Sequence, residues 1–382
     1  MLPLFLTSAL GVQIQEAFGL TDSGFGAVVT MYHVSGVVLG MALGRYIDRI
    51  GWPRAVRLSG LVATLSLIGI ATAARTAVVF AAMLIVGGVA HASAMASVNL
   101  AIVREIPLHR HAVVFGLKQA APTGGFLVAG LSLPLVALTF GWRWTFAGAA
   151  ALTFLAVGFV PTPARAPAMS QHAAGSRAHS QRGAIRMPAT GFMAVAGAAA
   201  AMSVSALAAF LVIANVAAGV EPSAAGVLVA VCSVVGITVR VVAGAYTDKR
   251  GSNGLGLVAF LLLLGCLGYV ALATGQRPLL FVGSLVAFGA GWGWPGLFHF
   301  AVVSINPEAP AAATGLTHAA VSFGSAVGPV GFGLIAEAGG YGWAWAAVAI
   351  VAGLAAGLIL AARSVIARTS PMEAAAPSSA RA

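Results

Sequence analysis

Two short stretches, 200 positions apart, decide the fold: Gly44-Arg-Tyr-Ile-Asp48-Arg49-Ile-Gly51 and Gly244-Ala-Tyr-Thr-Asp248-Lys249-Arg-Gly251. The chain contains only three Asp, and two of them occupy the same place in these frames. A second pairing agrees, because Gly116 and Gly125 align with Gly315 and Gly324 at an offset of 199. This self-similarity indicates that the two halves of the chain are copies of one structural unit.

The composition excludes an ordinary soluble protein. Of the 382 residues, 60% are hydrophobic and 8% are charged, and the mean hydropathy is +0.98, whereas soluble domains carry about 25% charged residues. The net charge of +11 does not indicate a nucleic-acid partner, because the basic residues are scattered singly between long apolar runs. The expected surroundings are therefore a lipid bilayer.

Twelve apolar stretches are candidate membrane spans, since about 20 helical residues cross a bilayer core. Helices are favoured over a barrel because the stretches are apolar on all sides instead of alternating. The first stretch is too short to cross, so either the native start lies upstream or this helix is incomplete. The stretches are 2–14, 24–43, 55–74, 77–102, 112–138, 144–160, 191–218, 224–245, 254–274, 279–303, 311–336 and 342–362.

A polar segment divides these spans into two groups of six. Residues 161–190 combine several Pro, Ser and Ala with four Arg and no acid, which is typical of a flexible linker. We therefore predict a six-helix bundle over 1–160, a cytoplasmic linker over 161–190, a second six-helix bundle over 191–366 and a disordered cytoplasmic tail over 367–382. The fold class is an all-α membrane protein.

The basic residues predict the orientation. Fifteen of the 20 Lys and Arg fall on the side of the two termini, three fall in the alternate loops, and Lys118 and Arg240 lie within spans. Positive residues favour the cytoplasmic side, so both termini are predicted to be cytoplasmic. The chain contains 18 Arg and only two Lys, which is typical of a GC-rich bacterial genome. We expect a monomer in a bacterial inner membrane.

With its doubled G-x-x-x-D-R/K-x-G loop and its six-plus-six layout, the chain resembles the major facilitator superfamily of secondary transporters. The resemblance covers essentially the whole chain and implies two bundles that rock about a central site. It also implies that the doubled loops form a cytoplasmic latch that is made and broken during transport. A tight turn with positive anchors is the simpler alternative. The latch residues are Gly44, Asp48, Arg49, Gly51, Gly244, Asp248, Lys249 and Gly251.

Two cations lie deep within the predicted spans. Lys118 is about 10 Å beyond the inner end of its span, and Arg240 is about 12 Å before Asp248, at 1.5 Å per residue. No acidic residue lies at comparable depth, and a buried charge without a partner is strongly disfavoured. The missing counter-ion is therefore predicted to be an anionic substrate. Arg240 also resembles the arginine in the eighth span of monocarboxylate and oxalate/formate transporters, although it would alternatively bond backbone carbonyls or extend towards the interface.

Six further residues are candidate lining of the same site. His33, His91, His299 and His318 lie within spans, and any proton coupling near neutral pH would act through them. For a single histidine, a hydrogen bond between helices is the alternative. Gln119 and His318 are equivalent positions of the repeat. Trp292 lies in Trp292-Gly-Trp294-Pro295, where Pro and Gly can break a helix beside a cavity; filling space between helices is the alternative.

The sequence thus predicts a secondary active transporter of a small, carboxylate-like organic anion. The alternative within transport is efflux of a drug or another hydrophobic compound, although the arginine early in the fourth span of proton-driven exporters is replaced here by Met83 or Leu84. A membrane sensor without transport activity is the alternative of another class. An enzyme is not expected, because no Cys/His metal spacing, phosphate loop or paired membrane carboxylate occurs; no cofactor and no metal are expected.

Asp48→Asn is expected to slow transport several-fold while leaving the protein inserted, because it removes the anion of one predicted latch. Turnover is measured in proteoliposomes at matched protein density, with Asp248→Asn as the equivalent change in the other half. Unchanged turnover in both variants would remove the latch hypothesis.

Overall fold

The computed structural model describes residues 1–107, 111–160, 187–250 and 253–374, and every regular element in these ranges is helical. In chain order the elements are α1 (Leu2–Ala9), α2 (Gly11–Phe18), α3 (Asp22–Ile50), α4 (Trp52–Thr72), α5 (Ala77–Glu105), α6 (His111–Ser132), the π-helix η2 (Leu133–Ala137), α7 (Leu138–Phe140), α8 (Trp142–Gly158), α10 (Met187–Ala217), α11 (Pro222–Arg250), α12 (Leu255–Ala273), α13 (Arg277–Gly289), α14 (Pro295–Ile305), α15 (Pro310–Gly339) and α16 (Tyr341–Ala374).

Each of the twelve predicted spans corresponds to one helix or to one interrupted helix. Within the described ranges, eight helices are individually long and apolar enough to cross a membrane. Three predicted spans are interrupted: the first at Leu10 between α1 and α2, the fifth at η2, and the tenth between α13 and α14. The all-α membrane fold expected from the sequence is confirmed.

The interruption in the tenth span follows from its sequence. Pro295 has no backbone N–H and cannot continue the hydrogen-bonding pattern of a preceding helix. Residues 290–294 accordingly form turns, and α14 begins at Pro295. Such a break leaves backbone carbonyls available to other donors inside the membrane.

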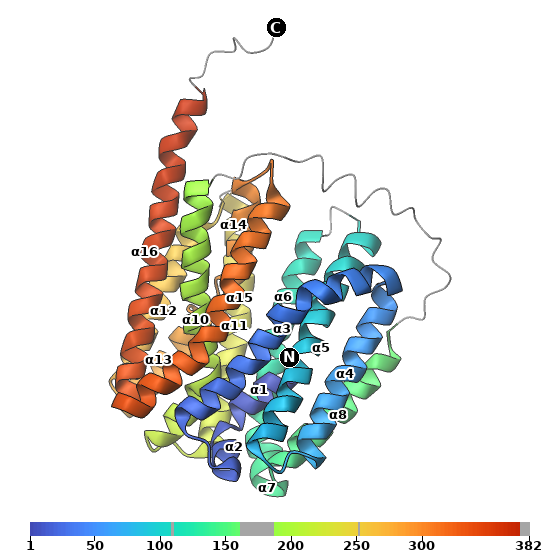
Figure 1. The fold of residues 1–382 in the computed structure, drawn as a ribbon. Coiled ribbons are helices and arrows are strands. Elements are labelled where there is room, and N and C mark those ends of the chain that lie inside the picture. The colour runs from blue at the N-terminus through green and yellow to red at the C-terminus, as the bar shows by residue number, and fades with distance from the viewer. Residues whose placement is uncertain (108–110, 161–186, 251–252, 375–382) are drawn as a thin grey trace.

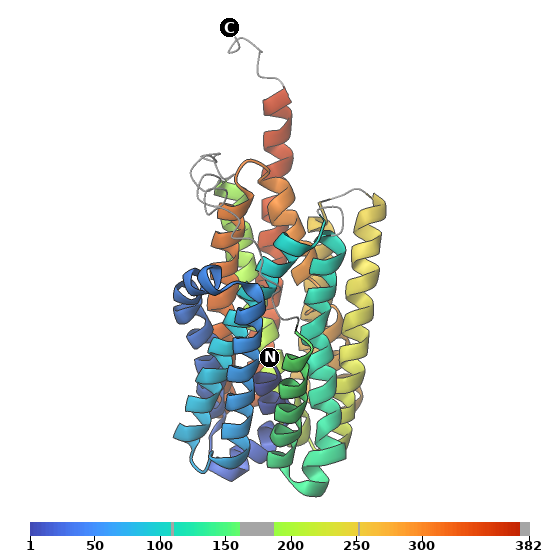
Figure 2. The ribbon, with the colours of Figure 1, turned by 90° about the vertical axis from the view of Figure 1, so that its right-hand side faces the viewer.

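The helices form two groups (Figure 1). In the N-terminal group, α5 packs against α3 and α4, and α4 packs against α8. In the C-terminal group, α10 packs against α15 and α16, and α12 packs against α16 and α13. Viewed at right angles, α6 and α11 rise side by side (Figure 2), in agreement with their extensive contact.

The two groups meet most closely at the end opposite the doubled loops, the lower end in Figure 1, which we call the far end. There α3 packs along α15, and α6 packs along α11. Glycines make this approach possible: a Cβ on Gly226 would lie 2.8 Å from the carbonyl oxygen of Gly130, and a Cβ on Gly26 would clash with the carbonyl of Pro329. Small residues of this kind let helix backbones approach closely in a membrane.

Hydrogen bonds reinforce the same interface. Tyr341 donates its hydroxyl to Asp22 at 2.8 Å, and the backbone N–H of Ser23 donates to the carboxylate of Glu337 at 3.2 Å. Further along α3, the Thr30 hydroxyl donates to the carbonyl of Ala326 at 2.6 Å. The far end is therefore closed by polar and backbone contacts between the halves.

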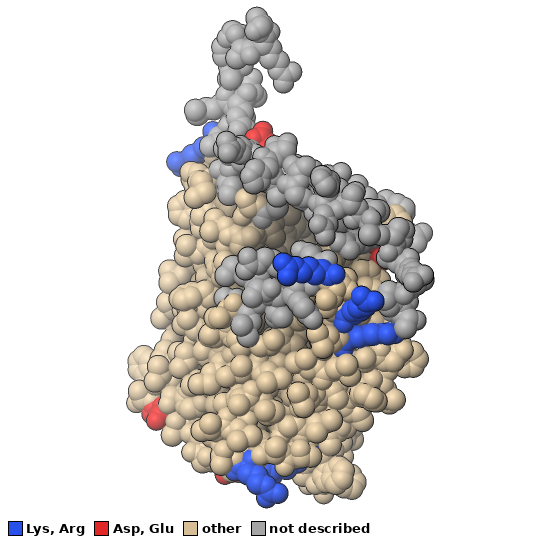
Figure 3. Space-filling model, turned by 45° about the vertical axis from the view of Figure 1, so that its right-hand side comes forward, with Lys and Arg blue, Asp and Glu red and all other residues tan. Residues whose placement is uncertain are grey.

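The outer surface matches a protein surrounded by lipid. Large apolar side chains such as Val78, Leu135 and Phe159 are strongly exposed. In Figure 3 a largely uncharged surface separates the Lys and Arg side chains at mid-height from the charged side chains at the lower end. An exposed apolar band between two charged zones is expected of a membrane-spanning bundle.

The predicted segment boundaries differ from the structure at two places. Helix α10 begins at Met187, within the predicted linker 161–190, of which residues 161–186 lie outside the described part of the chain. Helix α16 continues to Ala374, although the disordered tail is predicted from residue 367. Once a long helix has formed, each further residue is added at little cost, so it extends past the apolar run.

Gly26→Val is expected to separate the two halves at the far end, because its side chain would enter the space occupied by the Pro329 backbone. Spin labels at Arg75 and Gln276, both exposed on loops of opposite halves, would report a longer distance in this variant. Gly148→Val is the matched control, since a Cβ at Gly148 meets nothing within 4 Å. An unchanged distance distribution in Gly26→Val would contradict this account of the interface.

Candidate functional site

Five of the predicted site residues lie in one region between the halves. Lys118 on α6 lies within electrostatic range of His91, His299 and His318, and His33 and His318 lie within range of His91. The rings of His299 and His318 lie 6.3 Å apart between centroids. We call His33, His91, Lys118, His299 and His318 the cationic cluster, and it draws on both halves.

Tyr32 organises the histidines of the N-terminal half. Its ring stacks on His91 at 6.0 Å and meets His33 edge-on at 5.6 Å. The Tyr32 side chain is fully buried, and its hydroxyl has no hydrogen-bond partner among the described residues. A rigid buried ring therefore fixes two imidazoles on adjacent helices.

Lys118 has a partner that the sequence did not suggest. Its ammonium donates to the amide oxygen of Asn99 on α5 at 2.6 Å. Asn99 carries no charge, so a search of the spans for ionisable residues passes over it. The available signal was a polar amide within an apolar run, where lone polar groups are costly unless they are paired.

In the C-terminal half, His299 lies near the start of α14, shortly after the break. Its Nδ1 lies 2.7 Å from the carbonyl oxygen of Pro295, and because a carbonyl only accepts, Nδ1 must carry the proton. In the neutral ring the other nitrogen, Nε2, is then an acceptor. His318 on α15 is exposed, so the two rings present polar nitrogen atoms beside Lys118.

Arg240 has a different environment. Its Nε and Nη2 donate to the carbonyl oxygen of Trp292 at 3.2 and 2.7 Å, and its guanidinium carbon lies 5.5 Å from the centre of the Trp292 ring. The interruption between α13 and α14 makes this carbonyl available. Nη1 is buried without a hydrogen-bond partner in the described part of the chain. Arg240 therefore ties α11 to the break and retains one unsatisfied nitrogen.

The Trp292 ring belongs to an aromatic layer between the halves. It lies 4.9 Å from Phe288, 5.7 Å from Phe126 and 6.4 Å from Phe5. Along α6, Phe126 lies between Lys118 and the far-end Gly130. Trp292 thus both packs between helices and faces a cation, and the aromatic layer separates the cationic cluster from the far end.

The two predicted cations have separate partners: Lys118 donates to Asn99, and Arg240 donates to the Trp292 carbonyl. The other predicted residues are described only in part. At the doubled loops, Gly51 adopts φ +81°, a conformation that favours glycine. Arg49, Asp248 and Lys249 are exposed, and nothing lies within 4 Å of a Cβ at Gly244. The side chains of Gly44, Asp48 and Gln119 and the whole of Gly251 lie outside the described residues.

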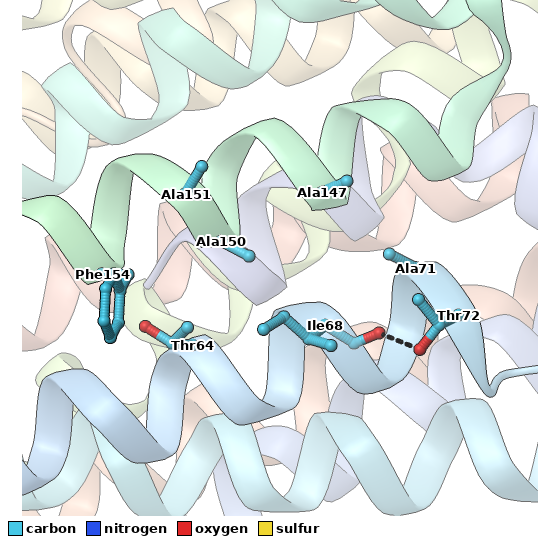
Figure 4. Close-up of a pocket in the computed structure, with 8 residues that line it drawn as sticks. All are labelled: Thr64, Ile68, Ala71, Thr72, Ala147, Ala150, Ala151 and Phe154. Atoms are coloured by element: carbon cyan, nitrogen blue, oxygen red, sulfur yellow. Dashed lines mark hydrogen bonds between the residues drawn. The ribbon is translucent and has the colours of Figure 1, made fainter.

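A groove on the outer side of the N-terminal bundle has a different character. It has a volume of about 380 Å³ between α4 and α8, and it is lined by Ile68, four alanines, Phe154 and two threonines (Figure 4). Thr64 and Thr72 donate to carbonyls of their own helix at 2.9 and 2.8 Å. The groove therefore offers only apolar contacts. No group of three potential metal ligands occurs within the described ranges.

The fold and the interior site define a membrane transporter built from two six-helix bundles. The family model described as Major Facilitator Superfamily matches residues 3–318, and the chain belongs to this superfamily. A comparison with curated protein sequences finds no match.

Solved structures of transporters share the fold. A bacterial homologue of the human lysosomal transporter Spinster, in an inward-facing and occupied conformation, is similar with a TM-score of 0.77 and 16% identity over 95% of this chain and 93% of that one. The human organic anion transporter MFSD10 has a TM-score of 0.65 and 18% identity over 94% and 96%. The nucleoside transporter NupG has a TM-score of 0.65 and 14% identity over 95% and 96%.

Arg240→Met is expected to lower the thermal unfolding midpoint by a few degrees, because leaving the buried Trp292 carbonyl without donors costs about 1–3 kcal/mol. The midpoint is measured in detergent from tryptophan fluorescence. Arg240→Lys, which keeps one donor and the charge, is expected to lose less. Equal midpoints in all three proteins would show that the bonds to Trp292 contribute nothing to stability.

Proposed function

We propose that this protein is a secondary active transporter that moves a small organic anion by alternating access, with the cationic cluster as its binding site. One observation carries the proposal: the cations lie deep in the helices, and all nine acids lie near the helix ends. Each Asp and Glu is between helices or within two residues of a helix terminus, whereas Lys118 is seven residues inside α6 and Arg240 is ten residues inside α11.

An anionic substrate follows from this separation of charge. A cation inside the membrane needs a counter-charge or good polar partners, and no carboxylate of the chain occupies the middle of a helix. The ammonium of Lys118 and imidazole N–H groups are donors suited to carboxylate oxygens. A cationic drug would find no matching acid there, which favours anion transport over drug efflux.

The position of the cluster supports alternating access. Its members come from α3, α5 and α6 in one half and from α14 and α15 in the other, as expected of a site between rocking bundles. With the orientation predicted from the basic residues, the closed far end is the outer end. The site would then be reached from the cytoplasm, where exposed His318 and Asn99 approach it.

The histidines supply a route for proton coupling. Imidazole is the side chain that titrates nearest neutral pH, and four imidazoles belong to the proposed anion site. An anion among them favours their protonated forms, so substrate and proton binding would be coupled. MFSD10 is described as an organic anion transporter, but the proposal rests on the site of this chain because that likeness concerns the fold.

Lys118→Gln is expected to raise the KM for the transported anion about 10- to 100-fold, the equivalent of about 1.5–3 kcal/mol for a hydrogen bond to a charged group. Uptake of labelled monocarboxylates and dicarboxylates into proteoliposomes measures this change. Arg75→Gln is the matched control, because it removes one exposed positive charge outside the spans. Flux of a lipophilic cation without flux of any anion would overturn the proposed substrate class.

A further inference from the structure

The contact between Lys118 and Asn99 joins a charged donor to a neutral acceptor at the centre of the proposed site. The two atoms are 2.6 Å apart, and the residues lie on the consecutive helices α5 and α6. Asn99 is exposed, and Lys118 is half-buried. The amide oxygen is therefore within reach of anything that approaches the ammonium.

We propose that Asn99 is a positioning residue that holds the Lys118 ammonium with a neutral oxygen, which a carboxylate oxygen of the substrate then replaces. This inference rests on the proposed function and adds the residue that prepares its lysine. In the open site the amide oxygen accepts a hydrogen bond from Nζ; in the bound site the substrate's carboxylate does.

The neutrality of Asn99 is what allows the exchange. A lysine on its flexible stem loses rotamer entropy when it is fixed. Because Asn99 already fixes the ammonium, this entropy is lost before the substrate arrives. A carboxylate at the same position would bind the ammonium more strongly, because charged acceptors form roughly twice as strong a hydrogen bond. An internal carboxylate would then compete with the substrate.

Asparagine and aspartate have nearly the same shape, so Asn99→Asp changes the charge with little change in volume. Asn99→Ala instead removes this acceptor from the ammonium of Lys118. The exchange Asn99→Lys with Lys118→Asn keeps one cation and one amide in contact but reverses their positions. These three variants separate charge, positioning and location.

The chain contains only two lysines, Lys118 and Lys249, which makes the cluster lysine directly observable. Reductive methylation with ¹³C-formaldehyde gives each lysine and the N-terminal amine its own NMR signals, which Lys249→Arg and Lys118→Gln assign. Oxalate, lactate and succinate are titrated into the detergent-solubilised full chain. Lys249 is exposed in the last turn of α11 and serves as the internal reference within every sample.

In the wild type, at least one of these anions is expected to shift the Lys118 signals and leave those of Lys249 in place. Asn99→Asp is expected to shift the Lys118 signals without any added anion and to weaken anion binding at least about tenfold, as expected for a competing charge at this distance. Asn99→Ala should weaken binding less, and the exchanged pair should recover binding relative to Lys118→Asn alone.

The outcomes distinguish the two proposals. If no anion of the panel shifts Lys118 in the wild type, and transport assays show no anion flux, the proposed function fails. If anions shift Lys118 in the wild type and bind Asn99→Asp and Asn99→Ala with unchanged affinity, the role of Asn99 is overturned while the anion site stands. Unmoved Lys118 signals in Asn99→Asp without anion would also overturn it, since the contact itself would be absent.

Discussion

Charge in a membrane interior is the constraint on which the rest of this structure depends. Transferring an ion from water into hydrocarbon is costly, and a protein limits that cost by supplying hydrogen-bond partners or by leaving the ion accessible to water. Here the acids stay at the helix ends, and two cations remain at depth. Arg240 is supplied with a backbone carbonyl, and Lys118 is supplied with an amide oxygen. Both of these acceptors are neutral oxygens.

The interruption of the tenth span lies next to the backbone acceptors of Arg240 and His299. Because residues 290–294 leave the helical pattern, the carbonyl of Trp292 becomes an acceptor for Arg240. Within α14, the carbonyl of Pro295 keeps the proton of His299 on Nδ1. The Pro/Gly-rich break therefore supplies the backbone oxygen that orients Arg240. Irregular backbone within a membrane is tolerated where side chains supply such partners.

The contacts between the halves are distributed unevenly along the membrane normal, so the two ends of the molecule differ in how tightly they are closed. At the far end, glycines on α3, α6, α11 and α15 bring backbones into contact, with hydrogen bonds from Tyr341 and Thr30 across the interface. Between this end and Lys118 lies the aromatic layer of Phe5, Phe126, Phe288 and Trp292. A substrate at the cationic cluster would be separated from the far end by both barriers. Rocking of the bundles would have to break the polar contacts and separate the glycines before that end opens.

The sequence was sufficient for the fold because its signals are long and repeated. Twelve apolar runs and a loop frame repeated after 200 residues specify two equivalent bundles, and Pro295 marks a break that the structure contains. The partners of the buried cations were not predictable in the same way. Asn99 is unremarkable in sequence, and the acceptor at Trp292 is a backbone carbonyl, which no side-chain pattern reveals. Such contacts depend on how helices are rotated about their axes, and the uniformly apolar runs define that rotation only weakly.

The two deep cations are chemically suited to different tasks. A guanidinium is planar, permanently charged and able to donate several parallel bonds, so it can bind a carbonyl in two places and pack against an indole at once. Arg240 does both, which makes it part of the frame that links α11 to the break. An ammonium is compact and carried on a flexible stem, so it can exchange one acceptor for another with small movements. Lys118, half-buried beside an exposed amide and among imidazoles of both halves, has the properties of a group that moves with its ligand. The unsatisfied Nη1 of Arg240 then adds a fixed positive pole near the aromatic layer, while Lys118 supplies the adjustable one.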